Sequence, residues 1–270
     1  MLSRSNSFEQ STYKQLNVYD KIYTTNEVCI DMKVEIWSDF VSPLCYIAKR
    51  KFEIALQKFE QKQYVKVEFK SFLLHKEERA SNYSCEELLM ETCNVPISQL
   101  DDWLRRVYGQ AKKLNLPLNL EGFAWTNTRD AHRLVKFATT IGKDKELVDS
   151  LFNHFFSLKD KTKHNINDKN VLLKIACNCG LDRNEVSQLL SIKKYNRAIE
   201  LDEDDAREIG IEDVPFFIFN EKYALVGNQP VDVFLEALKE SWKEDEERLL
   251  KRQTKCSNET SYCEGDDCGM

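Results

Sequence analysis

The sequence predicts an α/β fold in which a long all-helical segment interrupts one small mixed sheet. Two strand-like segments flank a helix early in the chain, only helical periodicity follows between about residues 84 and 204, and two further strand-like segments precede a helix near residue 230. A β-α-β unit and a β-β-α unit can complete one sheet with helices on both faces. We therefore expect an N-terminal extension (1–31), a sheet domain (32–83 and 205–245), a helical insertion (84–204) and a cysteine-containing tail (246–270).

The first strand and helix are marked by a change of hydrophobic period. In "MKVEIWSDF", which begins at Met32, Val34 and Ile36 alternate with charged residues, and this alternation predicts a strand. Apolar residues then recur at helical spacing from Pro43 onward, and "VKVEFKSFLL" (65–74) alternates again as a second strand.

The rest of the chain follows the same logic. Apolar stripes at helical spacing recur through "SQLDDWLRRVYGQAKKLNL", "NTRDAHRLVKFATTIG" and the segments after them, up to about residue 204. Two apolar runs, 214–220 and 222–227, are separated by a short turn-like Asn220-Glu221 and predict a hairpin. Pro230 then opens a last amphipathic helix.

Composition excludes several classes of partner. The net charge is −6, with 39 basic and 45 acidic residues spread along the chain, so we expect no nucleic-acid partner. No apolar run approaches the roughly 18–20 residues of a membrane span, and the first thirty residues lack the apolar core of a secretory signal. We expect a cytoplasmic protein whose nine cysteines are mostly reduced thiols.

The junction of the first strand and helix carries the chemistry. Ser42, Pro43, Leu44 and Cys45 have the spacing of a C-x-x-C redox motif, with serine in the first place. An alkoxide forms far less readily than a thiolate, so Ser42 cannot replace an attacking cysteine. Two structural alternatives stay open: Ser42 is also a normal N-cap before Pro at the first helical position, and Cys45 can be a buried, inert thiol.

Three segments give the chain a family resemblance. They are "VEIWSDFVSPLCYIAKRKFE", "NTRDAHRLVKFA" and "DDAREIGIEDVPFFIFNEKYALVGNQPVDVFLEAL", and over about residues 32–242 the chain resembles the FrnE-like branch of the DsbA-like thioredoxin superfamily. The resemblance implies a thioredoxin-like fold with a large all-helical insertion domain. It also implies a cis peptide bond at Val214-Pro215, facing the helix start. Pro43 and Leu44 with Val214 and Pro215 are then the expected substrate-binding residues.

The resemblance leaves three functions open. The first is a divergent thiol-disulfide oxidoreductase or isomerase that acts on a thiol or peptide substrate, requires no cofactor, and uses Cys45 and the auxiliary pair Cys263 and Cys268. The second is an isomerase or transferase that depends on glutathione or a related thiol. Kappa-class glutathione transferases and hydroxychromene-carboxylate isomerases are similar to this fold and carry serine at the place of Ser42, where its hydroxyl contacts the cofactor thiolate. The third is a non-catalytic adaptor that binds an extended peptide.

The other cysteines and the histidines form no recognisable site. The spacing of Cys256, Cys263 and Cys268 is not that of a zinc knuckle, and we expect no metal. Cys179 falls on an apolar helix stripe and is expected in the core. His132 also neighbours such a stripe, and we interpret it as a packing residue.

Overall fold

The computed structural model describes residues 14–15, 32–75, 84–157 and 165–243. Within these residues a five-stranded mixed sheet has the order β1-β5-β4-β2-β3. Only β2 and β3 are parallel, and the other neighbouring pairs are antiparallel. The strands are β1 (Lys14–Gln15), β2 (Met32–Ser38), β3 (Val65–Ser71), β4 (Phe216–Phe219) and β5 (Tyr223–Val226).

Each face of this sheet has its own hydrophobic core. Alternate residues of β2 and β4, such as Val34 and Phe217, pack under α1 (Pro43–Lys58) and under a final helix. Within the described residues, that helix covers 231–243. The opposite face contributes Trp37 and Ile218 to a larger core shared with the helical block. Because both faces are covered, six of the seven residues of β2 are buried.

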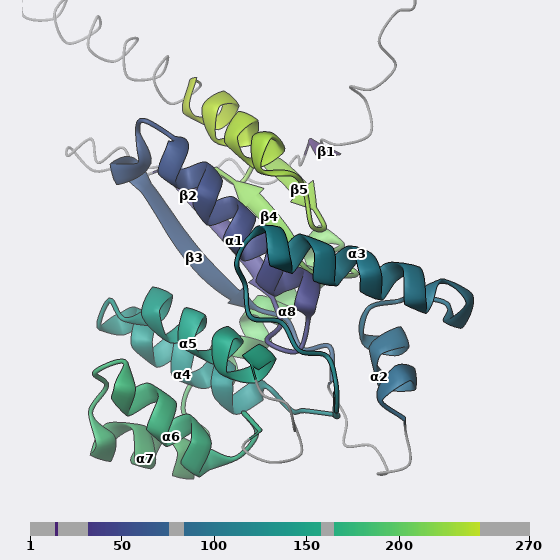
Figure 1. Cartoon of the computed structure of the whole chain (residues 1–270). Coiled ribbons are helices and arrows are strands. Elements are labelled where there is room, and N and C mark those ends of the chain that lie inside the picture. Colours follow the sequence, from purple (N-terminus) through teal and green to yellow (C-terminus); the bar gives the residue numbers. More distant parts are fainter. Residues whose placement is uncertain (1–13, 16–31, 76–83, 158–164, 244–270) are drawn as a thin grey trace, which may run out of the picture.

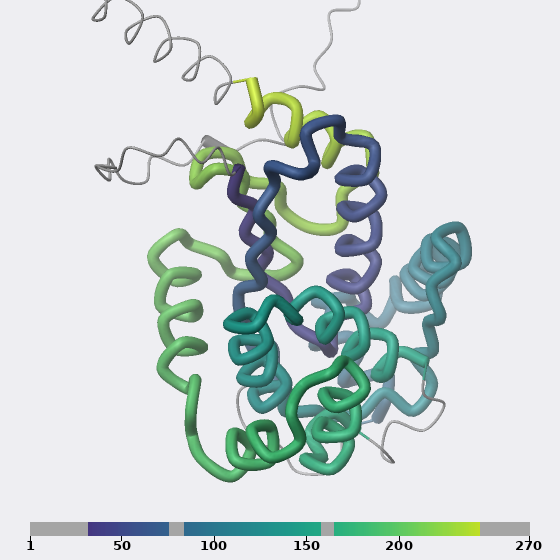
Figure 2. The backbone as a smooth tube through the Cα atoms, turned by 90° about the vertical axis from the view of Figure 1, so that its left-hand side faces the viewer, coloured from purple at the N-terminus to yellow at the C-terminus, as the bar shows by residue number. Residues whose placement is uncertain are grey.

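Most of the helical block lies at one end of the sheet, and one of its helices, Leu100–Lys113, lies beside α1 (Figures 1 and 2). Its helices are α2 (Cys85–Thr92), α3 (Leu100–Lys113), α4 (Arg129–Thr140), α5 (Asp144–Ser157), α6 (Lys169–Asn178), α7 (Arg183–Ser191) and α8 (Asn196–Ile209). Short 3₁₀ helices occur at Lys62–Tyr64 and Ile97–Gln99. The expected βαβ, helical block, ββα order is therefore confirmed, and the last helix of the block runs on to Ile209.

A buried carboxylate ties α8 to the sheet. Asp202, which is 4% exposed, accepts a hydrogen bond from the backbone amide of Ser71 at 2.7 Å and contacts the ammonium groups of Lys70 and Lys136. Its own carbonyl accepts a hydrogen bond from the indole of Trp37 on β2. One residue of α8 thus holds β2, β3 and α4 together.

The predicted hairpin forms between β4 and β5. Asn220 and Glu221 both have positive φ, 50° and 58°, which is the backbone of a type I′ turn, the connection that suits the twist of two antiparallel strands. Beyond the hairpin, β5 pairs with β1, a two-residue strand of the N-terminal extension that the sequence pattern did not predict.

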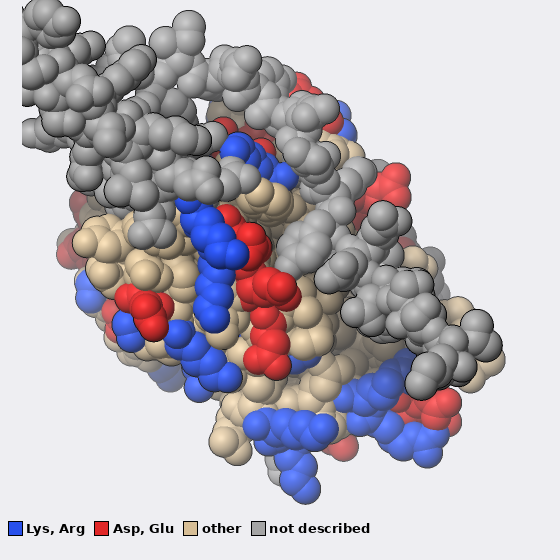
Figure 3. Space-filling view, turned by 90° about the horizontal axis from the view of Figure 1, so that it is seen from above, with Lys and Arg blue, Asp and Glu red and all other residues tan. Residues whose placement is uncertain are grey.

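The surface seen from above carries interleaved charges. In Figure 3, basic and acidic side chains stand side by side, and the described residues form no broad patch of one sign on this face. Among the described residues, no helix combines the length and apolar character needed to cross a membrane.

Candidate functional site

The site begins where β2 ends and α1 starts. The backbone of Ser42 is extended (φ −87°, ψ 113°), and its Oγ accepts a hydrogen bond from the amide of Cys45 at 3.2 Å, while Pro43 is the first helical residue. The predicted N-cap is therefore present. Capping uses the oxygen of Ser42 as an acceptor and leaves its O–H able to donate.

The cis peptide bond implied by the resemblance is also present, between Val214 and Pro215. Trp37 on β2 is paired with Phe216 on β4 in an antiparallel register, so the residues just before Phe216 lie opposite those just after Trp37. Val214 belongs to the same buried cluster as Cys45. The fold thus brings the Val214-Pro215 peptide to the end of the sheet from which α1 begins, and so places it near the helix start.

Cys45 is shielded from solvent. It is 1% exposed, and burial strongly raises the pKa of its thiol, with the charges of Asp39 and Asp213 acting in the same direction. The hydroxyl of Ser42 and the backbone of Asp39 oppose this shift without overcoming it. The thiol is therefore neutral at physiological pH, and a neutral thiol is a poor nucleophile.

The remaining cysteines divide into two groups. Cys263 and Cys268, the predicted auxiliary redox pair, lie outside the described residues, as do Cys29 and Cys256. The described cysteines are all free thiols: Cys45, Cys85, Cys93, Cys177 and Cys179. Burial, together with the charge of Asp213, raises the pKa of Cys93 to about 12. Cys179 is buried, as expected for a core residue.

A buried acid–imidazole pair lies directly behind the site. Asp39, fully buried, accepts a hydrogen bond from the amide of Leu74 at 2.8 Å, and its Oδ1 lies 3.4 Å from Nε2 of His132 on α4. Burial alone would raise the pKa of Asp39, but the hydrogen bond and charge of His132, with the Leu74 amide, hold that pKa below its ordinary value.

This pair was missed in the sequence, where His132 reads as a packing residue. His132 does pack, since its ring centroid lies 4.8 Å from that of Phe40. Its polar side nevertheless faces a carboxylate 93 residues earlier in the chain. The available signal was Asp39 itself, a charged residue between a buried strand and an apolar Phe-Val pair.

A second acid lies beside the cis peptide bond. The carboxylate of Asp213 accepts a hydrogen bond from the amide of Val214 at 2.7 Å, and burial raises its pKa. Among the described residues, no group of three or more His, Cys, Asp or Glu side chains is placed to hold a metal ion.

Comparison with known proteins agrees with this geometry. A family model described as a DSBA-like thioredoxin domain matches residues 33–239. The chain belongs to this family. A probable DsbA oxidoreductase from Streptomyces coelicolor is similar at 30% identity, with a TM-score of 0.69 over 79% of this chain and 91% of that one.

Two further relatives of this DsbA-like chain extend the comparison. The uncharacterized protein YwbO of Bacillus subtilis is 26% identical over 78% of this chain and 97% of its own length. A 2-hydroxychromene-2-carboxylate isomerase shares the fold, with a TM-score of 0.61 at 16% identity over 80% of this chain and 98% of that one. The DsbA-like fold of this chain is therefore shared by proteins named as oxidoreductases and as isomerases.

Proposed function

We propose that this DsbA-like protein binds the thiol of a low-molecular-weight compound such as glutathione at Ser42, and acts as a thiol-dependent isomerase or transferase. The observation that carries the proposal is the pairing of a serine hydroxyl at the start of α1 with a Cys45 thiol that is buried and held neutral. The reacting sulfur must then come from outside the protein.

The surroundings of Ser42 suit a thiolate. The oxygen of Ser42 is fixed by the Cys45 amide and its hydroxyl also interacts with the Cys45 thiol, so the proposal requires its O–H to turn from that thiol to a sulfur placed before the helix. Among the described residues, no hydrogen bond uses the amide of Leu44, and the N-terminal end of a helix dipole favours negative charge. Both effects lower the pKa of a bound thiol. When bound, the cofactor would supply the nucleophilic sulfur that the protein lacks.

Access to this position depends on the start of the helix. Ser42 is 3% exposed, whereas the side chain of Leu44 is half-buried and packs against the edge of the larger core. The proposal therefore requires the thiol to enter beside Leu44, with a local movement of the side chains that cover Ser42.

The test compares two serines with the same capping role. Ser42→Ala removes the proposed thiolate contact, and Ser84→Ala removes an N-cap of α2 that accepts from the Glu87 amide at 3.1 Å. Glutathione would be titrated by calorimetry, and the ionisation of its bound thiol followed by ultraviolet absorbance against pH. We expect the pKa of the glutathione thiol to fall on binding to the wild type and to Ser84→Ala. In the complex with Ser42→Ala it should be higher than in the wild-type complex by about one unit or more. Absence of glutathione binding, or an equal thiol pKa in all three proteins, would refute the proposal.

A second candidate function is thiol-disulfide exchange, favoured by the 30% identity to the Streptomyces protein named a probable DsbA oxidoreductase. Here Cys45, or the pair Cys263 and Cys268, would carry the exchange. Incubation with oxidised glutathione followed by peptide mass mapping separates the candidates. A mixed disulfide on Cys45 in the folded protein, or an oxidised Cys263–Cys268 pair, supports exchange, and cysteines that all stay free argue for Ser42.

A further inference from the structure

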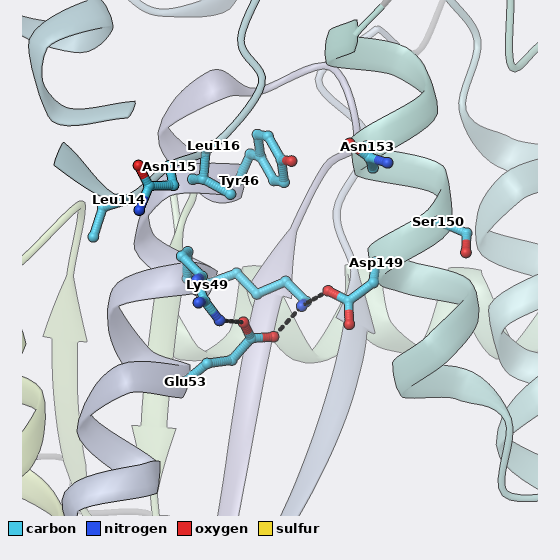
Figure 4. Close-up of a pocket in the computed structure, with 10 residues that line it drawn as sticks. Tyr46, Lys49, Glu53, Leu114, Asn115, Leu116, Asp149, Ser150 and Asn153 are labelled. Atoms are coloured by element: carbon cyan, nitrogen blue, oxygen red, sulfur yellow. Dashed lines mark hydrogen bonds and ion pairs between the residues drawn. The ribbon is translucent and has the colours of Figure 1, made fainter. Parts of the chain in front are cut away.

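A hollow of about 400 Å³ lies between α1 and α5, away from Ser42. Its walls come from three segments, α1, the chain just after α3, and α5, as Figure 4 shows. Its volume falls within the range of roughly 300–1,000 Å³ common for small-molecule sites. The hollow therefore has room for a metabolite of modest size.

An ion-pair bridge forms the base of this hollow. Lys49, 5% exposed, reaches from α1 and contacts both Glu53 on its own helix and Asp149 on α5. Arg50 contacts the second oxygen of Glu53 at 3.4 Å. The four charges sum to zero, so the site favours a ligand without net charge.

Two charged groups remain available after these pairings. Among the described residues, the Oδ2 atom of Asp149 has no partner, and the guanidinium of Arg50 uses one contact of its five N–H donors. The same hollow is thus bordered by a free carboxylate oxygen of Asp149 and by the largely unpaired guanidinium group of Arg50. That is the complement of a zwitterion, whose ammonium group would face Asp149 and whose carboxylate would face Arg50.

Tyr46 places a hydroxyl at the wall of the hollow. Its ring stacks on Phe152 and Phe156, with centroids 5.4 and 5.3 Å away, and the residue is 6% exposed. Its hydroxyl points across the hollow toward α5, where Asn153 lies, and makes no hydrogen bond to any described residue. Burial and the charges of Asp149 and Glu53 raise the pKa of Tyr46 to about 12, so the hydroxyl is a donor at neutral pH. Because this hydroxyl borders the hollow, an acceptor on a bound ligand can take its hydrogen bond.

The remaining walls define the rest of the ligand. The side-chain amides of Asn115 and Asn153 also lack partners among the described residues, and both line the hollow. Leu114 and Leu116 give one wall an apolar surface. We propose that the hollow between α1 and α5 is a binding site for a free amino acid with an apolar side chain. This proposal does not depend on Ser42.

Calorimetry with L-leucine as the probe tests the site. N-acetyl-L-leucine lacks the ammonium group and L-leucinamide lacks the carboxylate, so each should bind at least tenfold more weakly than L-leucine. Equal affinity for the blocked compounds would overturn the zwitterion argument. So would absence of any L-leucine binding up to about 10 mM, beyond the affinity range of a built site.

Variants locate the binding. Arg50→Gln and Asp149→Asn should each weaken L-leucine binding about tenfold or more, and Tyr46→Phe, which keeps the ring stack, should weaken it several-fold. The matched control is Arg197→Gln, because Arg197 contacts Glu200 three residues later at 3.4 Å, as Arg50 contacts Glu53, but on α8. Arg197→Gln should bind like the wild type. Unchanged affinity in both Arg50→Gln and Tyr46→Phe would overturn the proposal.

Discussion

The thiol of Cys45 lies in the first turn of α1, next to the amide that Ser42 caps, yet its chemistry is set by the apolar cluster around it. A helix N-terminus lowers the pKa of a thiol that solvent can reach. Here the residue is 1% exposed, and burial outweighs the helix and the Ser42 hydroxyl. The same sequence position can thus hold a reactive or an inert thiol, and packing decides between them.

We expect Cys45 to resist alkylation in the folded protein. Each unit by which its pKa is raised lowers the thiolate fraction tenfold, so iodoacetamide at about pH 8 should modify it at least a hundredfold more slowly than in the unfolded chain. Cys177, which is half-buried, serves as the internal comparison and should react first. Peptide mass spectrometry after timed quenching measures both. Equal rates at Cys45 and Cys177 would show that the first turn of α1 is open.

Asp39 should make stability depend on pH in the acid range. Its pKa is lowered in the folded state, so its contribution is present above the ordinary carboxyl pKa of about 3.9 and is lost as pH falls through the folded-state value. Asp39→Asn should therefore cost about 1–3 kcal/mol near pH 7 and progressively less toward about pH 3. Urea denaturation at several pH values measures this difference. The exposed Asp101→Asn is the control, and a constant cost of Asp39→Asn across the range would contradict the prediction.

Helices and strands differ in how much of their position local sequence determines. The start of α1 was predictable because Ser42 and Pro43 are adjacent and satisfy the helix end by themselves. The hairpin was predictable from two apolar runs and a short turn. The pairing of β1 with β5 was not, because two residues carry no period. The Asp39–His132 pair was not, because the two side chains lie on elements far apart in the sequence.

The attachment of α8 to the sheet depends on one of its acids. Asp202→Ala removes the buried carboxylate that faces the Lys136 ammonium and the Ser71 amide, and one of the four acidic partners of Lys70, so we expect a loss of about 3–5 kcal/mol of unfolding free energy in urea. Asp205 contacts Lys70 at the same 3.5 Å but is 49% exposed at its side chain. Asp205→Ala should cost no more than about 1 kcal/mol. Similar losses in the two variants would show that burial of the pair is not the cause.

At the scale of the whole molecule, both hydrophobic cores are built from the same part of the chain, residues 32–238. All residues of both buried clusters lie between Met32 and Leu238, and each cluster includes residues from before and from after the helical block. The sheet domain is therefore completed only by residues that follow the block, and neither part of the sheet contains a full core by itself.

A chain of residues 32–243 should keep the fold. It loses the two-residue pairing of β1 with β5, worth a few backbone hydrogen bonds, so its Tm should fall by no more than about 8 °C. A chain of residues 32–213, which lacks β4, β5 and the final helix, should not unfold cooperatively. Calorimetry and circular dichroism on both chains provide the measurement. A cooperative transition in the shorter chain would mean that the helical block is stable alone.

The position of β2 between β3 and β4 has a consequence during synthesis. Its parallel partner follows closely, but its antiparallel partner is translated only after the entire helical block. At a translation rate of about 5–20 residues per second, the β4 side of β2 stays unpaired for on the order of ten to forty seconds after β2 leaves the ribosome. An exposed, strongly apolar strand edge is a template for pairing with other chains. Nascent chains stalled before residue 216 should therefore bind chaperones, and those stalled well beyond residue 243 should release them.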